Sequence, residues 1–300
     1  MHNFITKFRK ILEISKQFAA NKVNERGNVP RRGVVPTFSD LEVVSLSITA
    51  EILNFDSENY LFNYLNKEHA GEIPNLITRR QFNHRRKLTI ELNEHIRKMI
   101  VNRIDGEEFI FSIDSKPVKV CQNARANRCE MGKNDMAYAP AWGYCASQNM
   151  RYYGYKLHAL CGTRGVIHSF DMTAANVHDI HYLKDIQWEY HDCMILGDKG
   201  YLNLAIQQDL FTKANITLEV PCRRNQKNKK PLTNVYKRFR KRVETVFSQL
   251  NDHLLMIRNY AKQPKGLFTR IAAKIFAFTI LQYFNFINNK DIGKVKYAMF

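Results

Sequence analysis

The stretch that decides the fold is Phe-Ile-Phe-Ser-Ile-Asp at residues 109–114. Aromatic and β-branched residues favour strands, so this run predicts a β-strand over 109–114. The strand ends on an acid, Asp114, and an acid at such a place needs a partner because burying an unpaired charge is costly. The secondary structure expected before this strand differs from the secondary structure expected after it.

Strands and helices alternate on the C-terminal side. Two strand candidates, 152–161 and 166–173, are joined by a glycine-bounded loop that is typical of a hairpin. After them we expect a helix over 178–189, a strand over 193–196, a helix over 202–214, a strand over 216–220 and a long helix over 233–258. This order predicts an α/β fold with a mixed five-stranded sheet flanked by helices.

The first hundred residues indicate helices. Two capping boxes, Ser39-Asp40-Leu41-Glu42 and Thr78-Arg79-Arg80-Gln81, predict helix starts, and Ser57 predicts a third. We therefore expect a helical domain over residues 1–104 and a second domain over 105–300 that includes the C-terminal helices. The apolar run 275–287 is too short to span a bilayer, so it predicts a buried helix.

Charge is distributed unevenly along the 300 residues, which carry a net charge of +18. Residues 1–100 hold 16 Lys and Arg against 11 acids, residues 101–222 hold 12 against 14, and residues 223–300 hold 18 against 3. A strongly basic end favours nucleic acid or an anionic membrane surface as partner, and a solubility surface is the alternative. The apolar fraction of 45% excludes general disorder.

The helix expected from residue 79 begins with an unusual run of cations. Cations at a helix N-terminus oppose its dipole, at roughly 0.3–1 kcal/mol each, and a bound polyanion would offset that cost. The run therefore predicts a helix-turn-helix-like DNA-binding domain, with a solvated basic helix end as the alternative. The candidate DNA contacts are Arg79, Arg80, His84, Arg85 and Arg86.

Three carboxylates lie where this fold can bring them together. Asp114 is on the first strand, Asp198 directly follows the fourth, and Glu244 lies on the last long helix. Oxygen-only ligands suit Mg²⁺ or Mn²⁺, and such a site suits two-metal phosphoryl transfer. By residue type alone, four other acids remain equally available: Asp171, Asp179, Glu189 and Asp192.

The six cysteines form no C-x-x-C pair, which is typical of a reduced, cytoplasmic protein. The first residues also lack the uninterrupted apolar core of a secretory signal. Cys121 and Cys129 with His158 or His178 are a weakly supported zinc site, because their spacing fits no common zinc module. His178 with His181 is a second weak metal hypothesis.

A series of motifs runs through the chain in order: IDSKPV at 113–118, CQNARANRC at 121–129, YGYKLH at 153–158, ANVHD at 175–179, GDKGY at 197–201 and RKRVETVF at 240–247. With these motifs the chain resembles DDE transposases of bacterial insertion sequences, most closely the family named for insertion sequence nine-eight-two. The resemblance covers most of the chain and is strongest over 109–260. Arg240 matches the wider family signature, whereas Lys237 and Asn251 stand where that signature often has Tyr and Lys.

The resemblance implies an RNase H-like fold in which Asp114, Asp198 and Glu244 hold two Mg²⁺ or Mn²⁺ ions, with no organic cofactor. It implies a transposase that binds insertion-sequence ends in double-stranded DNA, frees a 3′-hydroxyl and transfers that strand to target DNA. A homodimer on DNA, in the bacterial cytoplasm near the nucleoid, is expected with it.

Basic residues outside the first domain complete the expected DNA contacts. Lys156 and Lys199 lie beside strand ends and could hold the scissile phosphate, with ordinary surface lysines as the alternative. Arg125 and Arg128 are expected to bind the DNA end, with simple flanking of a basic loop as the alternative. A phosphate track is expected from Arg223, Arg224, Lys227, Lys229, Lys230, Lys237 and Arg240.

Two other functions stay open at this level. An RNase H-like DNA nuclease or resolvase would cleave DNA without joining strands. A DNA-binding remnant would have a decayed site, which an intact acidic triad argues against. A membrane-surface protein fits the charge but leaves the acids of the central region unexplained.

Overall fold

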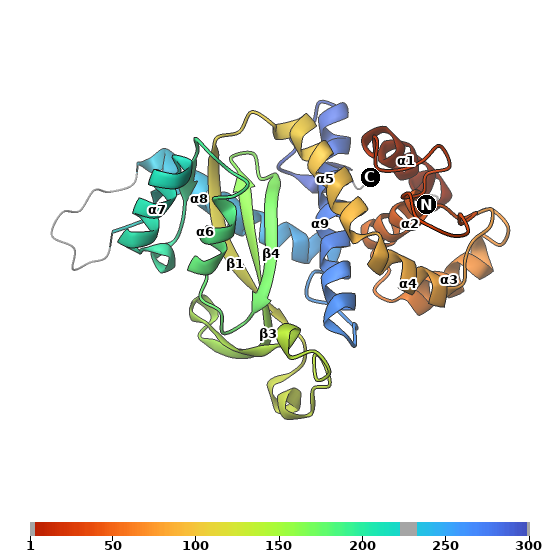
Figure 1. Cartoon of the computed structure of the whole chain (residues 1–300), viewed down its shortest axis with the longest axis horizontal. Helices are drawn as coiled ribbons and strands as arrows, with labels where there is room; N and C mark the ends of the chain where they lie inside the picture. The colour runs from red at the N-terminus through yellow and green to blue at the C-terminus, as the bar shows by residue number, and fades with distance from the viewer. Residues whose placement is uncertain (1–3, 223–232, 299–300) are drawn as a thin grey trace. The chain divides into compact units, whose positions relative to one another are not determined.

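The computed structural model describes residues 4–222 and 233–298 of the chain (Figure 1). These residues form two compact units. The helical unit comprises Met1–Ile104 and Gln249–Phe300, and the sheet unit comprises Asp105–Ser248. The predicted boundary after residue 104 coincides with a unit boundary, but the helices after residue 248 pack with the N-terminal helices. As a division into a DNA-binding and a catalytic domain, the boundary stays a prediction.

The predicted helix starts of the helical unit are confirmed. Ser39 and Thr78 each form a capping box, and the hydroxyl of Ser57 accepts a hydrogen bond from the N–H of Tyr60. The helices described for this unit are α1 (Phe4–Phe18), α2 (Asp40–Ile52), α3 (Glu58–Glu68), α4 (Arg79–Leu88), α5 (Ile90–Asp105), α9 (Pro264–Ile287) and the short η5 (Val295–Ala298).

Two features of this unit differ from the prediction. Helix α1 was not expected, and the single helix expected from residue 79 is two helices, α4 and α5. The break lies at Thr89, whose hydroxyl donates a hydrogen bond of 3.3 Å to the carbonyl of Arg86. A threonine that bonds the preceding turn in this way competes with the regular helical pattern.

Helix α9 confirms the buried helix predicted over 275–287. Among the described helices it is long and apolar enough to cross a membrane, and 89% of its apolar window is buried within the structure. Its neighbours include α2, and charged side chains join the two. Glu51 on α2 pairs with Lys274 at 2.7 Å and with Arg270 at 3.2 Å, both on α9, and lies 3.6 Å from Arg86 on α4.

The sheet unit contains a mixed sheet flanked by helices, as predicted. Its strands are β1 (Ile110–Lys119), β2 (Ala141–Cys145), β3 (Met150–Gly162), β4 (Ile167–Ala174), β5 (Met194–Leu196) and β6 (Thr217–Glu219). The order is β2-β3-β1-β5-β6, and β4 also pairs with β3. Strands β1 to β4 pair antiparallel through β3, whereas β5 and β6 continue parallel to β1.

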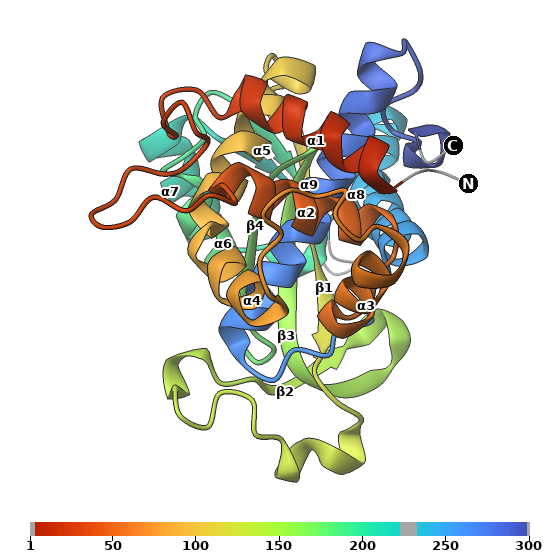
Figure 2. The ribbon, with the colours of Figure 1, turned by 90° about the vertical axis from the view of Figure 1, so that its right-hand side faces the viewer.

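The sheet has six strands where five were expected. The additional strand is β2, with the sequence AWGYC, which lies in the long connection from β1 to β3. Because this segment is short and has a glycine at its centre, its sequence does not predict a strand. In Figures 1 and 2 this connection extends beyond one end of the sheet.

Helices α6 (Ile180–Ile186), α7 (Leu204–Ala214) and α8 (Asn234–Leu254) accompany the sheet, and the last residues of α8 belong to the helical unit. A core of buried apolar residues from β1, β5, β6, α6 and α7 joins these layers. Short 3-10 turns lie in the connections: η1 (Asn123–Arg128), η2 (Met136–Tyr138), η3 (Ala146–Gln148) and η4 (Lys199–Tyr201).

Candidate active site

The register of two parallel strands places Asp114 beside Asp198. Ser112 on β1 pairs with Leu196 on β5, so each aspartate stands two residues beyond the same pair of partners. Strand β1 continues to Lys119, paired with β3, and Asp114 lies opposite Ala159 there. We had expected Asp114 at the end of its strand, but it lies in the middle of β1. It stands just past the point where the neighbouring strand β5 ends.

Helix α8 brings Glu244 to the same place. The helix buries an apolar stripe that includes Val243, Val246 and Phe247, and Glu244 borders this stripe on the exposed side. The Lys116 ammonium, two residues after Asp114, donates a hydrogen bond of 3.3 Å to the Phe247 carbonyl and lies 5.8 Å from the centre of its ring. This contact ties α8 to β1.

Arg240 lies between two of the three acids. Its Nη1 atom is 3.8 Å from Oδ1 of Asp198 and 3.7 Å from Oε1 of Glu244. The Asp198 and Glu244 side chains are 60% and 54% exposed, so both can reorient. The structure thus brings together the three acids that the sequence singled out, with one guanidinium between two of them.

The electrostatics of Asp114 reflect its burial and its position among other acids. The pKa of Asp114 is raised to about 6, mainly by burial and to a smaller extent by the charges of the neighbouring Glu244, Asp198 and Asp179. The N–H of Ser115 donates to Oδ1 at 2.8 Å and opposes this shift. A bound cation would relieve the mutual repulsion of these carboxylates.

Asp179 belongs to this acidic region although sequence reasoning left it out of the site. It accepts a hydrogen bond of 2.8 Å from the ammonium of Lys156, which also donates to the Val177 carbonyl at 2.7 Å. Lys156, expected to hold a phosphate, is thus already engaged inside the sheet unit. The signal for Asp179 was present, because it closes the ANVHD motif.

The backbone around Asp198 is fixed by local contacts. The N–H of Lys199 donates to Oδ1 of Asp198 at 2.7 Å, and the N–H of Tyr201 donates to its carbonyl at 3.0 Å. Tyr201 is buried and packs on Gly197, where an added Cβ would come within 3.2 Å of it. Glycine before Asp198 therefore allows this tyrosine to pack beneath the acid. The Tyr201 hydroxyl has no hydrogen-bond partner within the described residues.

The donor chemistry fits a divalent ion, whereas the spacing of the side chains requires adjustment. Within residues 4–222 and 233–298, no group of three or more His, Cys, Asp or Glu side chains is already arranged to hold a metal ion. The three acids offer only oxygen ligands, which suit Mg²⁺ or Mn²⁺. Asp198 and Glu244 are exposed, so their side chains have room to turn toward an ion, which would compete with Arg240 for their oxygens.

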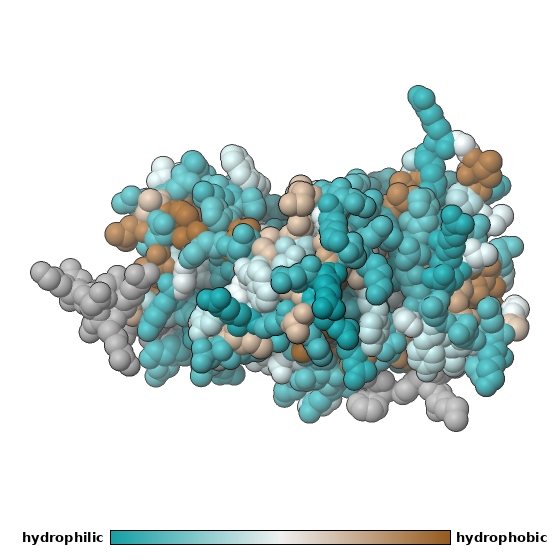
Figure 3. Space-filling model, turned by 90° about the horizontal axis from the view of Figure 1, so that it is seen from below, coloured by the Kyte–Doolittle hydropathy of each residue, from teal (hydrophilic) through white to brown (hydrophobic). Residues whose placement is uncertain are grey.

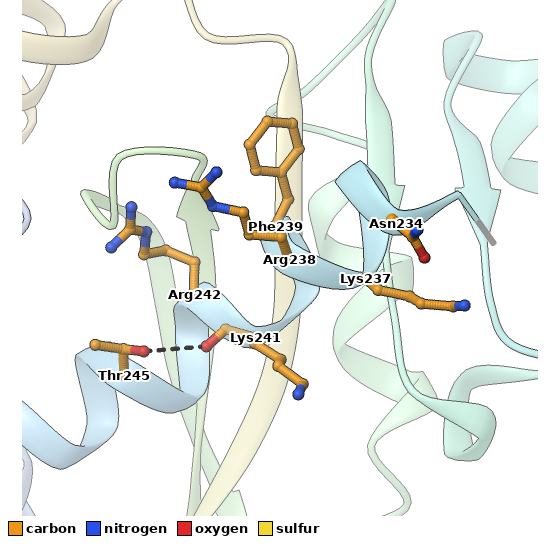
Figure 4. Close-up of a pocket in the computed structure, with 7 residues that line it drawn as sticks. All are labelled: Asn234, Lys237, Arg238, Phe239, Lys241, Arg242 and Thr245. Atoms are coloured by element: carbon orange, nitrogen blue, oxygen red, sulfur yellow. Dashed lines mark hydrogen bonds between the residues drawn. The ribbon is translucent and has the colours of Figure 1, made fainter.

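A basic groove lies along α8. It has a volume of about 540 Å³ and is lined by Asn234, Lys237, Arg238, Phe239, Lys241, Arg242 and Thr245 (Figure 4). Figure 4 shows Lys237 and Lys241 on one side of the helix and Arg238 and Arg242 on the other. Arg242 also donates to the Thr163 carbonyl at 3.0 Å. Four cations with no acid among the lining residues suit an anionic ligand.

The cations predicted on α4 divide into two groups. Arg79, Arg80 and His84 are exposed. Arg85 donates to Asp40 at 2.8 Å, and Arg86 pairs with Glu58 at 3.2 Å. The second group holds the helical unit together, so the exposed group is the one available to DNA.

The remaining predicted contacts are placed as follows. Arg125 and Arg128 are exposed on η1, and Lys199 is exposed beside Asp198. Lys237 is exposed and Arg240 is half-buried on α8. Arg223 and Arg224, with Lys227, Lys229 and Lys230, lie outside the described residues. As contacts with DNA, all of these stay predictions.

Residues 106–280 match the family model described as the transposase DDE domain. No curated protein and no solved structure matches the chain. The narrower resemblance to the insertion sequence nine-eight-two family stays a prediction. The matched residues are more than half of the chain and include Asp114, Asp198 and Glu244, and the chain therefore belongs to the DDE transposases.

Proposed function

We propose that this transposase binds the ends of an insertion sequence, cleaves a phosphodiester to free a 3′-hydroxyl and joins that hydroxyl to target DNA. The observation that supports it most is the shared position of Asp114 and Asp198 two residues beyond one strand pair, with Glu244 beside them. These acids are the residues that would hold Mg²⁺ or Mn²⁺. Two such ions would supply activation of the attacking oxygen and stabilisation of the leaving oxygen.

The chain's own residues have separate roles in this proposal. Water attacks the phosphodiester at the element's end, and the freed 3′-hydroxyl then attacks a target phosphodiester, so no protein nucleophile is required. We assign phosphate binding to the exposed cations of α8, because Lys237 and Lys241 line the basic groove on the same helix as Arg240 and Glu244. Lys116 keeps α8 against β1 and so maintains the distance between Glu244 and Asp114.

Binding of double-stranded DNA is assigned to the exposed residues of α4, namely Arg79, Arg80 and His84, and to Arg125 and Arg128 on η1. Because two ends must be held together for transfer, we infer a homodimer on DNA. Sedimentation of the protein with and without paired end duplexes tests this: the complex should contain two chains.

The experiment that tests the function combines cleavage and joining in one reaction. Purified protein is incubated with a labelled duplex of the element's own end and a target plasmid, in Mg²⁺, Mn²⁺ or EDTA. Glu244→Gln is compared with Asp209→Asn, a matched change of a half-exposed acid on α7 that pairs with Lys213. We expect metal-dependent cleavage and joining that Glu244→Gln abolishes and Asp209→Asn retains.

Other results would replace this proposal. Cleavage without joined product would indicate a nuclease or resolvase. Binding of the end duplex without either reaction would indicate a DNA-binding protein with an inactive site. Equal activity of Glu244→Gln and Asp209→Asn would remove Glu244 from the reaction.

A further inference from the structure

The connection from β1 to β3, residues 120–149, exposes large apolar side chains. Met136 is 80% exposed, Tyr138 54%, Trp142 46% and Tyr144 58%. Single exposed apolar residues are common on protein surfaces, but a group of them marks an interaction site. Figure 3 shows the molecule from the side on which this connection lies, with paler residues set among hydrophilic ones.

The pairing of β2 with β3 places aromatic and cationic side chains on one face. Trp142 pairs with Tyr153, and Tyr144 pairs with Arg151. The rings of Trp142 and Tyr153 lie 5.5 Å apart. The alternating residues, Gly143 and the buried Tyr152, belong to the other face of this hairpin. We call Trp142, Tyr144, Arg151 and Tyr153 the aromatic face.

The charge around the aromatic face is positive. Residues 119–153 carry five Lys and Arg against two acids, whereas the rest of residues 101–222 carries seven against twelve. One of the two acids, Glu130, pairs with Lys133. The amide of Asn123 donates to the Arg151 carbonyl at 2.9 Å, which joins the hairpin to η1 and its exposed Arg125 and Arg128. No ion pair engages Arg151 within the described part of the chain.

This combination fits a specific ligand chemistry. Aromatic rings stack on unpaired bases of any sequence, and neighbouring cations bind the backbone of the same strand. A paired duplex keeps its bases stacked on one another and does not offer them to an aromatic surface. Ala159 on β3 is the partner of Asp114. Tyr153 and Arg151 of the aromatic face precede Ala159 on the same strand by six and eight residues, or about 20–27 Å along β3.

We propose that the aromatic face binds unpaired bases of a DNA strand that extends from the acidic site. The proposal rests on the proposed function, because the strand is the one whose phosphodiester the acids process. It assigns a binding role to Trp142, Tyr144, Tyr153 and Arg151 that is separate from phosphate contacts on α4 and α8.

The two tryptophans of the chain, Trp142 and Trp188, allow a matched test. Trp188 is 77% exposed and lies after α6, away from the β2–β3 hairpin in sequence and pairing. With selective excitation of tryptophan, the Trp188→Phe protein reports on Trp142 and the Trp142→Phe protein reports on Trp188. Each is titrated in EDTA with a mixed-sequence single strand, the same strand with abasic sites, and the corresponding duplex.

We expect the single strand to quench Trp142 in Trp188→Phe and to leave Trp188 unquenched in Trp142→Phe. The abasic strand and the duplex should quench Trp142 much less. Trp142→Ala should weaken single-strand binding, measured by anisotropy, about ten-fold, with duplex affinity unchanged, whereas Trp188→Ala should leave both unchanged. Trp142→Phe, which keeps a ring, should retain most single-strand affinity.

Three results would overturn the proposal: no quenching of Trp142, equal losses for single strand and duplex in Trp142→Ala, or a change in oligomeric state of Trp142→Ala that marks the face as a contact between protein chains. Since the titrations need no metal and no reaction, they are independent of strand transfer. A protein that stacks bases but never joins strands would contradict the proposed function and retain the base-binding face.

Discussion

Two groups of buried or half-buried charges in this chain have opposite balances. In the helical unit, one acid, Glu51, is surrounded by Arg86, Arg270 and Lys274. Burial would raise the pKa of Glu51, but these three cations lower it below its usual value. In the sheet unit, burial raises the pKa of Asp114 to about 6, and the three other acids beside it contribute to the same shift.

The difference separates structure from function. A buried charge that its own fold compensates holds helices together, and removing it leaves its partners unpaired. A group of acids that the fold leaves under-compensated indicates a site arranged for something that binds there. The first group links α2, α4 and α9 through ion pairs. The acids of the second group come from β1, from the end of β5 and from α8.

The largest expected effect is on the reaction. Asp114→Asn should lower strand transfer on the order of 10³-fold, comparable to the removal of a preorganised electrostatic group from an active site. The melting temperature without metal should not fall, because the change removes a charge that its neighbours repel. Calorimetry of the two proteins in EDTA, beside the transfer assay, checks both parts, and a large loss of stability would contradict the contrast with Glu51.

The corresponding change in the helical unit should act on stability. Glu51→Gln should lower the free energy of unfolding by about 3–5 kcal/mol, because it leaves buried cations uncompensated. Urea denaturation measures this. The exposed Glu91→Gln on α5 is the matched control and should change stability by less than about 0.5 kcal/mol. Similar values for the two variants would show that the cluster does not hold the unit together.

The same group predicts a pH dependence. Since the pKa of Glu51 is lower in the folded protein, its stabilising effect is fully present above its usual value of 4.5 and is lost as the pH falls through the folded value. The free energy of unfolding should therefore decrease on acidification below about pH 4.5, and less so in Glu51→Gln. Denaturation curves from pH 3 to 7 measure this, and parallel pH profiles would count against it.

Arg240 sharpens the comparison at the acidic site. Its guanidinium stands between Asp198 and Glu244, so it competes with a divalent ion for the same carboxylates. Arg240→Gln should bind Mn²⁺ about ten-fold more tightly in calorimetry, a change of about 1.4 kcal/mol. Arg238→Gln, on another side of α8, should bind Mn²⁺ like the parent. Weaker binding by Arg240→Gln would show that Arg240 supports the metal site instead.

The smallest effects are expected on α4, where exposed cations and cations paired within the helical unit occur on one helix. Replacing the exposed Arg79 and Arg80 by Ala should weaken duplex binding at low salt and reduce the slope of log affinity against log salt by about 2. The melting temperature of the protein with both arginines replaced should equal that of the wild type. Arg85→Ala should lower the melting temperature, because Arg85 pairs with buried Asp40. A salt titration by anisotropy checks the slope, and an unchanged slope would remove both arginines from the DNA surface.

Much of the fold was predictable because local signals were strong. The capping boxes at Ser39 and Thr78, the hairpin of β3 and β4 and the alternation from α6 to α8 are confirmed. Strand β2 and the break at Thr89 were missed. Strand β2 depends on its pairing with β3, and the break coincides with a single side-chain hydrogen bond. Hydrophobic periodicity reports neither of them.

The candidate site was predictable in part. Residue chemistry alone left Asp114, Asp198 and Glu244 among seven acids, and the family resemblance selected them. The register that aligns the two aspartates and the pairing of Lys156 with Asp179 are tertiary facts. For the same reason, sequence reasoning could not separate Arg85 and Arg86, which are paired within the unit, from Arg79 and Arg80, which are exposed.

Titration with Mn²⁺ by calorimetry measures directly whether Asp114, Asp198 and Glu244 hold a divalent cation. We expect the wild-type protein and Asp209→Asn to bind Mn²⁺ alike, and Asp114→Asn, Asp198→Asn and Glu244→Gln each to lose most of that binding. Equal binding by all five proteins would show that the metal binds somewhere other than these acids.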